Sequence, residues 1–276
     1  DSLANNDVTI TTNSNISGNG DIALRGGAHV GWNANTTLTL SAYHDIIFQP
    51  GSSISNGTTA NPGAGNLILR ADNSGIGSGT VVFPSTAQSG QVDFSHSTGA
   101  VSIYYNPSTE NPSQTKYQNP TDFSCCVSVQ QSSQLTAYML VNNASDLQAV
   151  STNLGGTYAL GRSFSAAGFT GFAPGTTFTG LFDGNGGISA ANYTITDLTL
   201  SSANSPVALF PFIESGATVR NLNLANVNIT GTGSLIFLGT LAGENRGTIS
   251  NVHILSGTVA GGSQTGVVAG GLVVAA

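Results

Sequence analysis

The amino-acid sequence predicts an all-β protein folded as a right-handed parallel β-helix. Three observations support this prediction: short segments alternate apolar and polar residues, glycine-rich turns separate them, and one phrase recurs near the C-terminus. Alternation with a period of two is typical of strands, and self-similarity every 20–50 residues or so is typical of stacked repeats. A β-propeller, which needs about four strands per blade and a longer period, is the second choice.

The recurring phrase reads threonine, β-branched aliphatic, any residue, Asn or Asp, aliphatic, any residue, aliphatic. Its copies occupy residues 193–200, 217–224 and 247–254, so they begin 24 and 30 residues apart. Stacked rungs about 4.8 Å apart would bury the aliphatic positions and align the Asn/Asp positions in one column. Turn or surface chemistry is the alternative for the Asn and Asp residues. The predicted repeat positions are Ile195, Asp197, Leu198, Leu200, Val219, Asn221, Leu222, Leu224, Ile249, Asn251, Val252 and Ile254.

Residues 1–105 predict an uninterrupted series of β-helix rungs. Turns rich in Gly, Asn and Pro separate the strands and supply the backbone conformations that tight turns need. The candidate strands are 7–11, 22–24, 37–40, 45–48, 66–70, 80–83, 91–94 and 100–105.

Residues 106–134 break this rhythm with three Asn-Pro steps, which favour extended or turn geometry. We expect a loop or lateral excursion here. Residues 135–276 then predict a second stretch of β-helix, continuous with the first and truncated at both ends. It opens with a strand over 135–141 and one short helix near 145–153, with Ser145 as its cap and Asp146 in its first turn.

Composition excludes several classes of function. The net charge is −7, charged residues are 7% of the chain, and Lys116 is the single lysine. Nucleic-acid binding needs clustered Lys and Arg, so we expect no nucleic-acid partner. A membrane-spanning helix needs an apolar run of about 18 residues, and the sequence contains none. The polar N-terminus predicts no signal peptide, so either the mature protein starts here or the chain is a piece of something longer.

Few residues suggest catalysis or metal binding. Asp183, followed by Gly-Asn-Gly, is the best single candidate for a catalytic carboxylate, although Asp-Gly is also an ordinary turn. Asp72 and Asp93 are weaker candidates of the same kind. The four histidines lack metal-ligand spacing and are expected at structural or surface positions: His29, His44, His96 and His253. We therefore expect no catalytic residue, no cofactor and no metal.

The remaining candidates are sulfur and aromatic residues. Cys125 and Cys126 are adjacent, and adjacent cysteines rarely bond, so unpaired thiols are expected, with a vicinal or intermolecular disulfide as the alternative. Trp32 and the pair Tyr104–Tyr105 could stack on sugar if exposed, but core packing is the favoured interpretation.

Three phrases in the second half resemble the GLUG repeats of filamentous-haemagglutinin-type bacterial exoproteins. They occupy residues 147–161, 178–186 and 241–249, and residues 37–42, 65–72 and 101–107 resemble the same proteins. The resemblance implies a secreted or surface-exposed protein of Gram-negative bacteria, exported by two-partner secretion with an outer-membrane partner. The chain departs from the repeat at Pro211, where a glycine is expected.

These observations predict a structural or display segment of a large adhesin that is not an enzyme. Host or surface glycans and proteins are the expected partners. Self-association end to end is also expected, through the apolar positions Val267, Val268, Leu272, Val273 and Val274. A β-helix polysaccharide lyase or hydrolase, and a biofilm or surface-filament protein without a specific ligand, are the alternatives.

Overall fold

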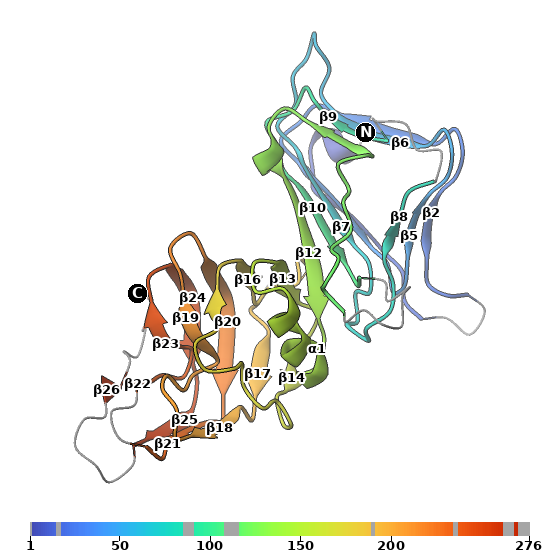
Figure 1. The fold of residues 1–276 in the computed structure, drawn as a ribbon. Coiled ribbons are helices and arrows are strands. Elements are labelled where there is room, and N and C mark those ends of the chain that lie inside the picture. The colour runs from blue at the N-terminus through green and yellow to red at the C-terminus, as the bar shows by residue number, and fades with distance from the viewer. Residues whose placement is uncertain are drawn as a thin grey trace. The chain divides into compact units, whose positions relative to one another are not determined.

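The computed structural model describes residues 2–14, 18–84, 91–107, 116–188, 191–233, 237–261 and 268–269. The chain divides into two compact units (Figure 1). Unit 1 comprises residues 1–107 and 120–140, and unit 2 comprises residues 108–119 and 141–276. The chain thus leaves unit 1, contributes a short segment to unit 2, and returns before it crosses for the last time.

Unit 1 is a parallel β-helix with three walls, which Figure 1 shows enclosing the core. Through most of the unit, each strand pairs in parallel with the strand three elements later, giving sheets β1-β4-β7-β10-β12, β2-β5-β8 and β3-β6-β9-β11. Its elements are η1 (Ser2–Ala4), β1 (Val8–Thr11), β2 (Ile22–Leu24), β3 (His29–Trp32), β4 (Thr37–Ser41), β5 (Ile46–Phe48), β6 (Ser53–Asn56), β7 (Asn66–Arg70), β8 (Val81–Val82), β9 (Val92–Phe94), β10 (Val101–Tyr105), β11 (Val127–Val129), η2 (Ser132–Gln134) and β12 (Leu135–Val141).

In unit 1, the strand register places aliphatic residues of successive rungs opposite one another on the inner face of the wall. Leu38 lies opposite Leu67, 29 residues further on, and Leu67 lies opposite Val101, 34 residues further on. These side chains are 2%, 0% and 0% exposed, respectively, because alternate residues of each strand face the core. The predicted parallel β-helix is therefore confirmed.

Unit 2 is also built from stacked parallel strands, and its strands range from two residues to the eight residues of β20. Its sheets contain β13-β16-β20-β24, β14-β17-β20, β15-β19-β23, β18-β21-β25 and β22-β26, all parallel. Its elements are α1 (Ala144–Ala149), η3 (Val150–Thr152), β13 (Thr157–Leu160), β14 (Phe164–Ser165), β15 (Thr177–Phe178), β16 (Leu181–Asp183), β17 (Thr194–Thr196), β18 (Thr199–Ser202), β19 (Phe210–Ile213), β20 (Thr218–Ala225), β21 (Val227–Gly231), β22 (Phe237–Leu238), β23 (Ala242–Asn245), β24 (Thr248–Ile254), β25 (Gly257–Ala260) and β26 (Val268–Ala269).

Strand β20 corrects the predicted stacking of the first two repeat copies. Its first residues pair with β16 and its last residues with β17, so Ile195 lies opposite Leu224 and not opposite Val219. The second and third copies stack as predicted, with Leu224 opposite Ile254. The 24-residue spacing suggests that the first two copies stack directly on each other. They do not, because β20 is one long strand that pairs with two short strands of the previous rung, β16 and β17.

The short helix lies where the sequence predicts it, but its cap differs. The side chain of Asn143, and not of Ser145, accepts the Asp146 backbone N–H at the helix start. The helix is six residues long. Within the described residues, no helix has the length and apolar character needed to cross a membrane.

Within the predicted excursion 106–134, the structure describes residues 106–107 and 116–134. Tyr117 is 1% exposed and packs edge-on against Tyr158 in unit 2, with ring centroids 5.2 Å apart. Lys116 forms an ion pair with Asp146 of α1 at 2.8 Å. Strand β11 then adds to the β9 edge in unit 1. The apolar C-terminal positions predicted to cause self-association lie outside the described side chains.

Candidate functional site

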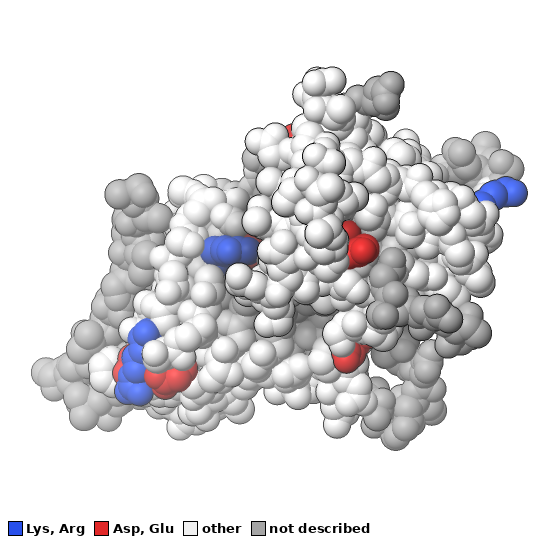
Figure 2. Space-filling model, turned by 90° about the horizontal axis from the view of Figure 1, so that it is seen from above, with Lys and Arg blue, Asp and Glu red and all other residues white. Residues whose placement is uncertain are grey.

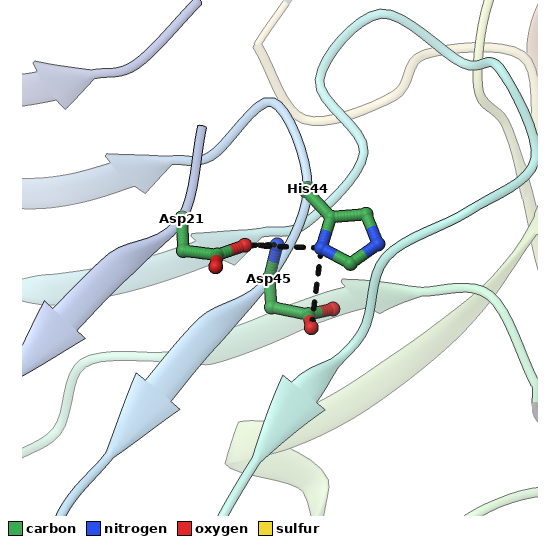
Figure 3. A group of neighbouring side chains, drawn as sticks. All are labelled: Asp21, His44 and Asp45. Carbon is green, nitrogen blue, oxygen red and sulfur yellow. Dashed lines mark hydrogen bonds and ion pairs between the residues drawn. The ribbon is translucent and has the colours of Figure 1, made fainter. Parts of the chain in front are cut away.

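Two carboxylates and one histidine meet at a corner of unit 1. Asp21 lies directly before β2, and His44 and Asp45 lie directly before β5, so stacking of the rungs brings them together (Figure 3). His44 Nδ1 lies 3.0 Å from Asp21 Oδ1 and 3.2 Å from Asp45 Oδ2. All three side chains are partly exposed. Their potential ligand atoms lie within 4.8 Å of one another, which makes the group a candidate cation site.

The carboxylates of this corner also join successive rungs. Asp21 Oδ1 accepts the Asp45 backbone N–H at 3.0 Å, and Asp45 Oδ1 accepts the Thr80 backbone N–H at 2.7 Å. His44 Nδ1 faces both carboxylates and Nε2 points away from them, so the geometry assigns the proton to Nδ1 (Figure 3). The group therefore serves as a hydrogen-bonded corner, and a cation there would have to displace that proton.

This group was not predicted from the sequence because Asp21 lies 23 residues before the adjacent pair His44 and Asp45. Asp21-Ile22 and Asp45-Ile46 are the same dipeptide one rung apart, and that repetition was the available signal. The other three histidines lie apart from it. They bond to hydroxyl or amide oxygens: His29 to Ser53, His96 to Thr59, and His253 to Asn251.

Asp183, the best sequence candidate for catalysis, has its carboxylate occupied by structural partners. Arg220 Nε lies 2.7 Å from Oδ2, while Asn221 Nδ2 and the Asn185 backbone N–H donate to Oδ1 at 3.0 and 2.9 Å. The Asp183 side chain is 6% exposed, whereas that of Arg220 is 37% exposed. A buried carboxylate with its charge paired in this way connects β16 to β20.

The other sequence candidates also have structural contacts. Asp72 is buried and accepts the N–H groups of the following turn, and Asp93 does the same for Ser95. Trp32 packs edge-on against Phe94, and Tyr104 stacks on Tyr138. Trp32, Tyr104 and Tyr105 are at most 9% exposed, which confirms core packing over sugar stacking.

The predicted single column of Asn and Asp residues is wrong, because the structure contains two columns. Asn251 Nδ2 donates to Asn221 Oδ1 at 2.9 Å, and Asn221 in turn donates to Asp183. Asp197 belongs to the second column, where Asn226 Nδ2 donates to its Oδ1 at 2.7 Å. The separation follows from the β20 register, which places Asp197 beside the end of β20.

Two adjoining pockets lie on unit 2. The first, called here the α1 pocket, is a cavity of about 490 Å³ between α1 and the loop after β14. The second, called here the β18 pocket, is about 130 Å³, and Thr170 lines both. The α1 pocket is lined by Ala144, Ser145, Gln148, Ala149, Ser151, Thr152, Ala167, Gly168 and Thr170. The β18 pocket is lined by Thr170, Gly171, Phe172, Pro174, Leu200, Ser201, Ser202, Pro206, Val207 and Ala208.

The wall between these pockets is fixed by one glutamine. Gln148 Nε2 donates to the Gly171 carbonyl at 3.0 Å, and Gln148 Oε1 accepts the Thr170 backbone N–H and hydroxyl at 3.0 and 2.8 Å. All lining residues are uncharged and six carry hydroxyl groups. Such a surface offers hydrogen bonds and apolar contacts but no ion pair, which suits a neutral ligand better than a charged one.

Comparison with known families identifies most of unit 2. The sequence profile of the M26 IgA1-specific metallo-endopeptidase N-terminal region matches residues 101–256, which is more than half of the chain. Halomucin of Haloquadratum walsbyi (strain DSM 16790 / HBSQ001) is 31% identical over 152 residues, covering 48% of this chain. The chain spans only 2% of the length of that relative. No solved structure matches the chain. The two matches agree with a secreted or surface-exposed protein.

A catalytic zinc in a peptidase usually has three protein ligands, for example two histidines and a glutamate. Residues 101–256 contain one histidine, His253, and its Nε2 lies 2.9 Å from Asn251 Oδ1. The matched segment therefore does not by itself fit a two-histidine zinc site. The Asp21–His44–Asp45 corner lies outside the match and also offers one histidine.

The family match corrects two expectations from the sequence. The repeat phrases do not place the chain among the filamentous haemagglutinins, because stacked β-helix rungs give similar alternating phrases in unrelated families. The expectation that the protein is not an enzyme is also overturned, since the matching family is part of metallo-endopeptidases. Nothing supports two-partner secretion for this chain. The chain belongs to the M26 IgA1-specific metallo-endopeptidase N-terminal region family.

Proposed function

We propose that this chain is the partner-engaging β-helix of a secreted or surface-exposed, protease-related protein. In this role it would attach the parent protein to a macromolecular partner. Attachment is also the function expected of an adhesin, although the family is a different one. The observation that carries the proposal is that the endopeptidase match falls mainly on unit 2, where the two uncharged pockets adjoin.

The surface chemistry supports attachment to a neutral partner. Figure 2 shows a face with a few charged side chains separated by broad uncharged areas. Hydroxyl groups and the fixed Gln148 wall offer hydrogen bonds without charge, and a rigid wall reduces the entropy lost on binding. Polypeptides are the first class of partner to test because the matching family is one of endopeptidases.

The test is a binding assay of the chain against immobilised IgA1, a panel of other surface proteins, and neutral glycans. Ser151→Arg in the α1 pocket and Ser201→Arg in the β18 pocket place a cation at exposed positions and should abolish binding. Thr179→Arg, also exposed in unit 2 but outside both pockets, is the matched control. Binding that survives both pocket variants, or no binding to any probe, would refute the proposal.

A further inference from the structure

A disulfide joins two consecutive residues directly before β11 in unit 1. Cys125 and Cys126 are the only cysteines of the chain, and the structure bonds them to each other, contrary to the unpaired thiols expected from the sequence. Cys125 is exposed, whereas Cys126 is 2% exposed. An external reagent would therefore meet the sulfur of Cys125 first.

The backbone around the bond holds the start of β11 in place. The N–H groups of Cys126 and Val127 donate to the Phe123 carbonyl at 3.1 and 3.2 Å. The Cys126 carbonyl accepts the Val92 N–H at 3.1 Å, which is the first contact between this turn and β9. The residue that carries the buried sulfur therefore also connects the turn to the neighbouring strand.

Phe123 fixes the other end of the same turn. Its side chain is 3% exposed and packs edge-on against Tyr105 and Phe83, with ring centroids 5.0 and 6.2 Å away. The turn is thus closed between an aromatic contact and a disulfide. A disulfide between consecutive residues closes a small ring that contains their peptide bond, so it restricts the backbone at that point.

Strand β11 depends on this turn because it is short and has one neighbour. It spans three residues and ends the sheet β11-β9-β6-β3 in the described part of unit 1. Short edge strands open with low free-energy cost compared with the core. Breaking the disulfide and releasing the turn would therefore increase the opening of β11 before that of the other strands of the sheet.

We propose that Cys125–Cys126 is a thiol–disulfide exchange site for small external thiols, and that its redox state sets how firmly β11 is held on β9. A thiolate attacks Cys125 Sγ, the bond to Cys126 breaks, and Cys126 leaves as a thiolate that takes a proton from water. With a dithiol, the second thiol attacks the mixed disulfide, releases Cys125 as a thiol and becomes a cyclic disulfide. Two electrons thereby pass from the dithiol to the protein. A secreted or surface-exposed protein meets conditions in which the bond persists until such a thiol arrives.

Differential alkylation with mass spectrometry, using dithiothreitol as the reductant, tests the first half of this proposal. Protein purified in air should take up no alkylating reagent before reduction and two equivalents after it. Replacing dithiothreitol with oxidised glutathione, which accepts the two electrons and is reduced to two glutathione thiols, should restore the disulfide. Free thiols in the untreated protein, or a bond that resists reduction until the chain unfolds, would overturn the proposal.

Hydrogen exchange on the same oxidised and reduced samples tests the second half. Exchange of the β11 amides should accelerate by about tenfold or more on reduction, which corresponds to about 1.4 kcal/mol of opening free energy. The pair β3 and β6 in the same sheet is the internal control and should not change. A Cys125→Ser, Cys126→Ser double variant should exchange like the reduced protein with or without dithiothreitol. Equal exchange of β11 in both redox states would refute the proposal.

Discussion

In the described part of unit 2, four Asn and Asp residues take the left-handed backbone conformation, two of them inside β20 and β24 and two between consecutive strands. The φ angles of Asp197, Asn221, Asn226 and Asn251 lie between 50° and 59°. Asn and Asp tolerate this conformation better than other residues with side chains, and their short polar groups can bond to the next rung. Each such residue therefore meets a backbone requirement and a hydrogen-bonding requirement at once.

A substitution at Asn221 tests both its left-handed backbone conformation and its side-chain hydrogen bonds. Asn221→Ala removes the bonds to Asp183 and Asn251 and leaves an alanine at a φ of 53°. We expect the free energy of unfolding to fall by about 1–3 kcal/mol, since a buried carboxylate loses a donor. Asn221→Gly should recover the backbone part. Asn228→Ala removes only one exposed hydrogen bond, from the Thr258 hydroxyl, and should change stability less than Asn221→Ala does. Urea denaturation that finds Asn221→Ala as stable as the original chain would contradict this.

Because of Asp197, the stability contributed by the second Asn/Asp column should depend on pH in a predictable direction. Hydrogen bonds from Asn226, then Ser165 and Thr196, hold the pKa of its exposed carboxyl below the ordinary value of 3.8. A lowered pKa in the folded state stabilises the fold above the unfolded pKa, and that contribution is lost as pH falls through the folded pKa. The stability difference between the original chain and Asp197→Ala should therefore shrink below about pH 4. A difference that grows on acidification would contradict the assignment.

At the scale of elements, residues 116–119 form an integral part of unit 2. Tyr117 packs against Tyr158, and the carbonyls of Lys116 and Tyr117 accept side-chain donors from Thr152 and Asn153. These contacts place the returning chain against α1 and η3. Burial, together with the nearby Asp146 carboxylate, raises the pKa of Tyr117 well above its usual value, so its phenol stays neutral.

Tyr117→Ala tests whether this segment stabilises unit 2. Truncating a buried aromatic side chain costs about 3–5 kcal/mol in typical cores, and we expect a loss of that order. Tyr117→Phe keeps the ring and should cost much less. Hydrogen exchange should show the loss in β13 and α1, and a variant with unchanged exchange there would show that the segment only rests on the surface.

The elements show what the sequence could and could not predict. Alternation in 37–40 and 66–70 identified β4 and β7 because each wall buries every second side chain. The Asp21–His44 contact was not predicted because it depends on the offset between two rungs, which in the sequence is marked only by the repeated Asp-Ile dipeptide. The sequence left the vicinal disulfide only as an alternative, because the small ring that it closes makes bonding between adjacent cysteines rare. The family escaped because repeat phrases report stacking geometry, which unrelated β-helices share.

At the scale of the whole molecule, the low charge predicts weak dependence on salt. Charged residues are 7% of the chain, so few surface ion pairs are available for screening. Raising NaCl from about 0.05 to about 1 M should shift the melting temperature only slightly. The affinity of the chain for a neutral partner should also stay nearly constant as the salt concentration rises. A dissociation constant that rises steeply with salt would contradict a neutral interface.

The most direct measurement is the affinity of the chain for immobilised IgA1 and the panel of surface proteins, compared between the original chain, Ser151→Arg and Thr179→Arg. We expect binding by the original chain and by Thr179→Arg, and its loss in Ser151→Arg. Equal binding by all three proteins, or by none, would show that the α1 pocket does not engage a partner.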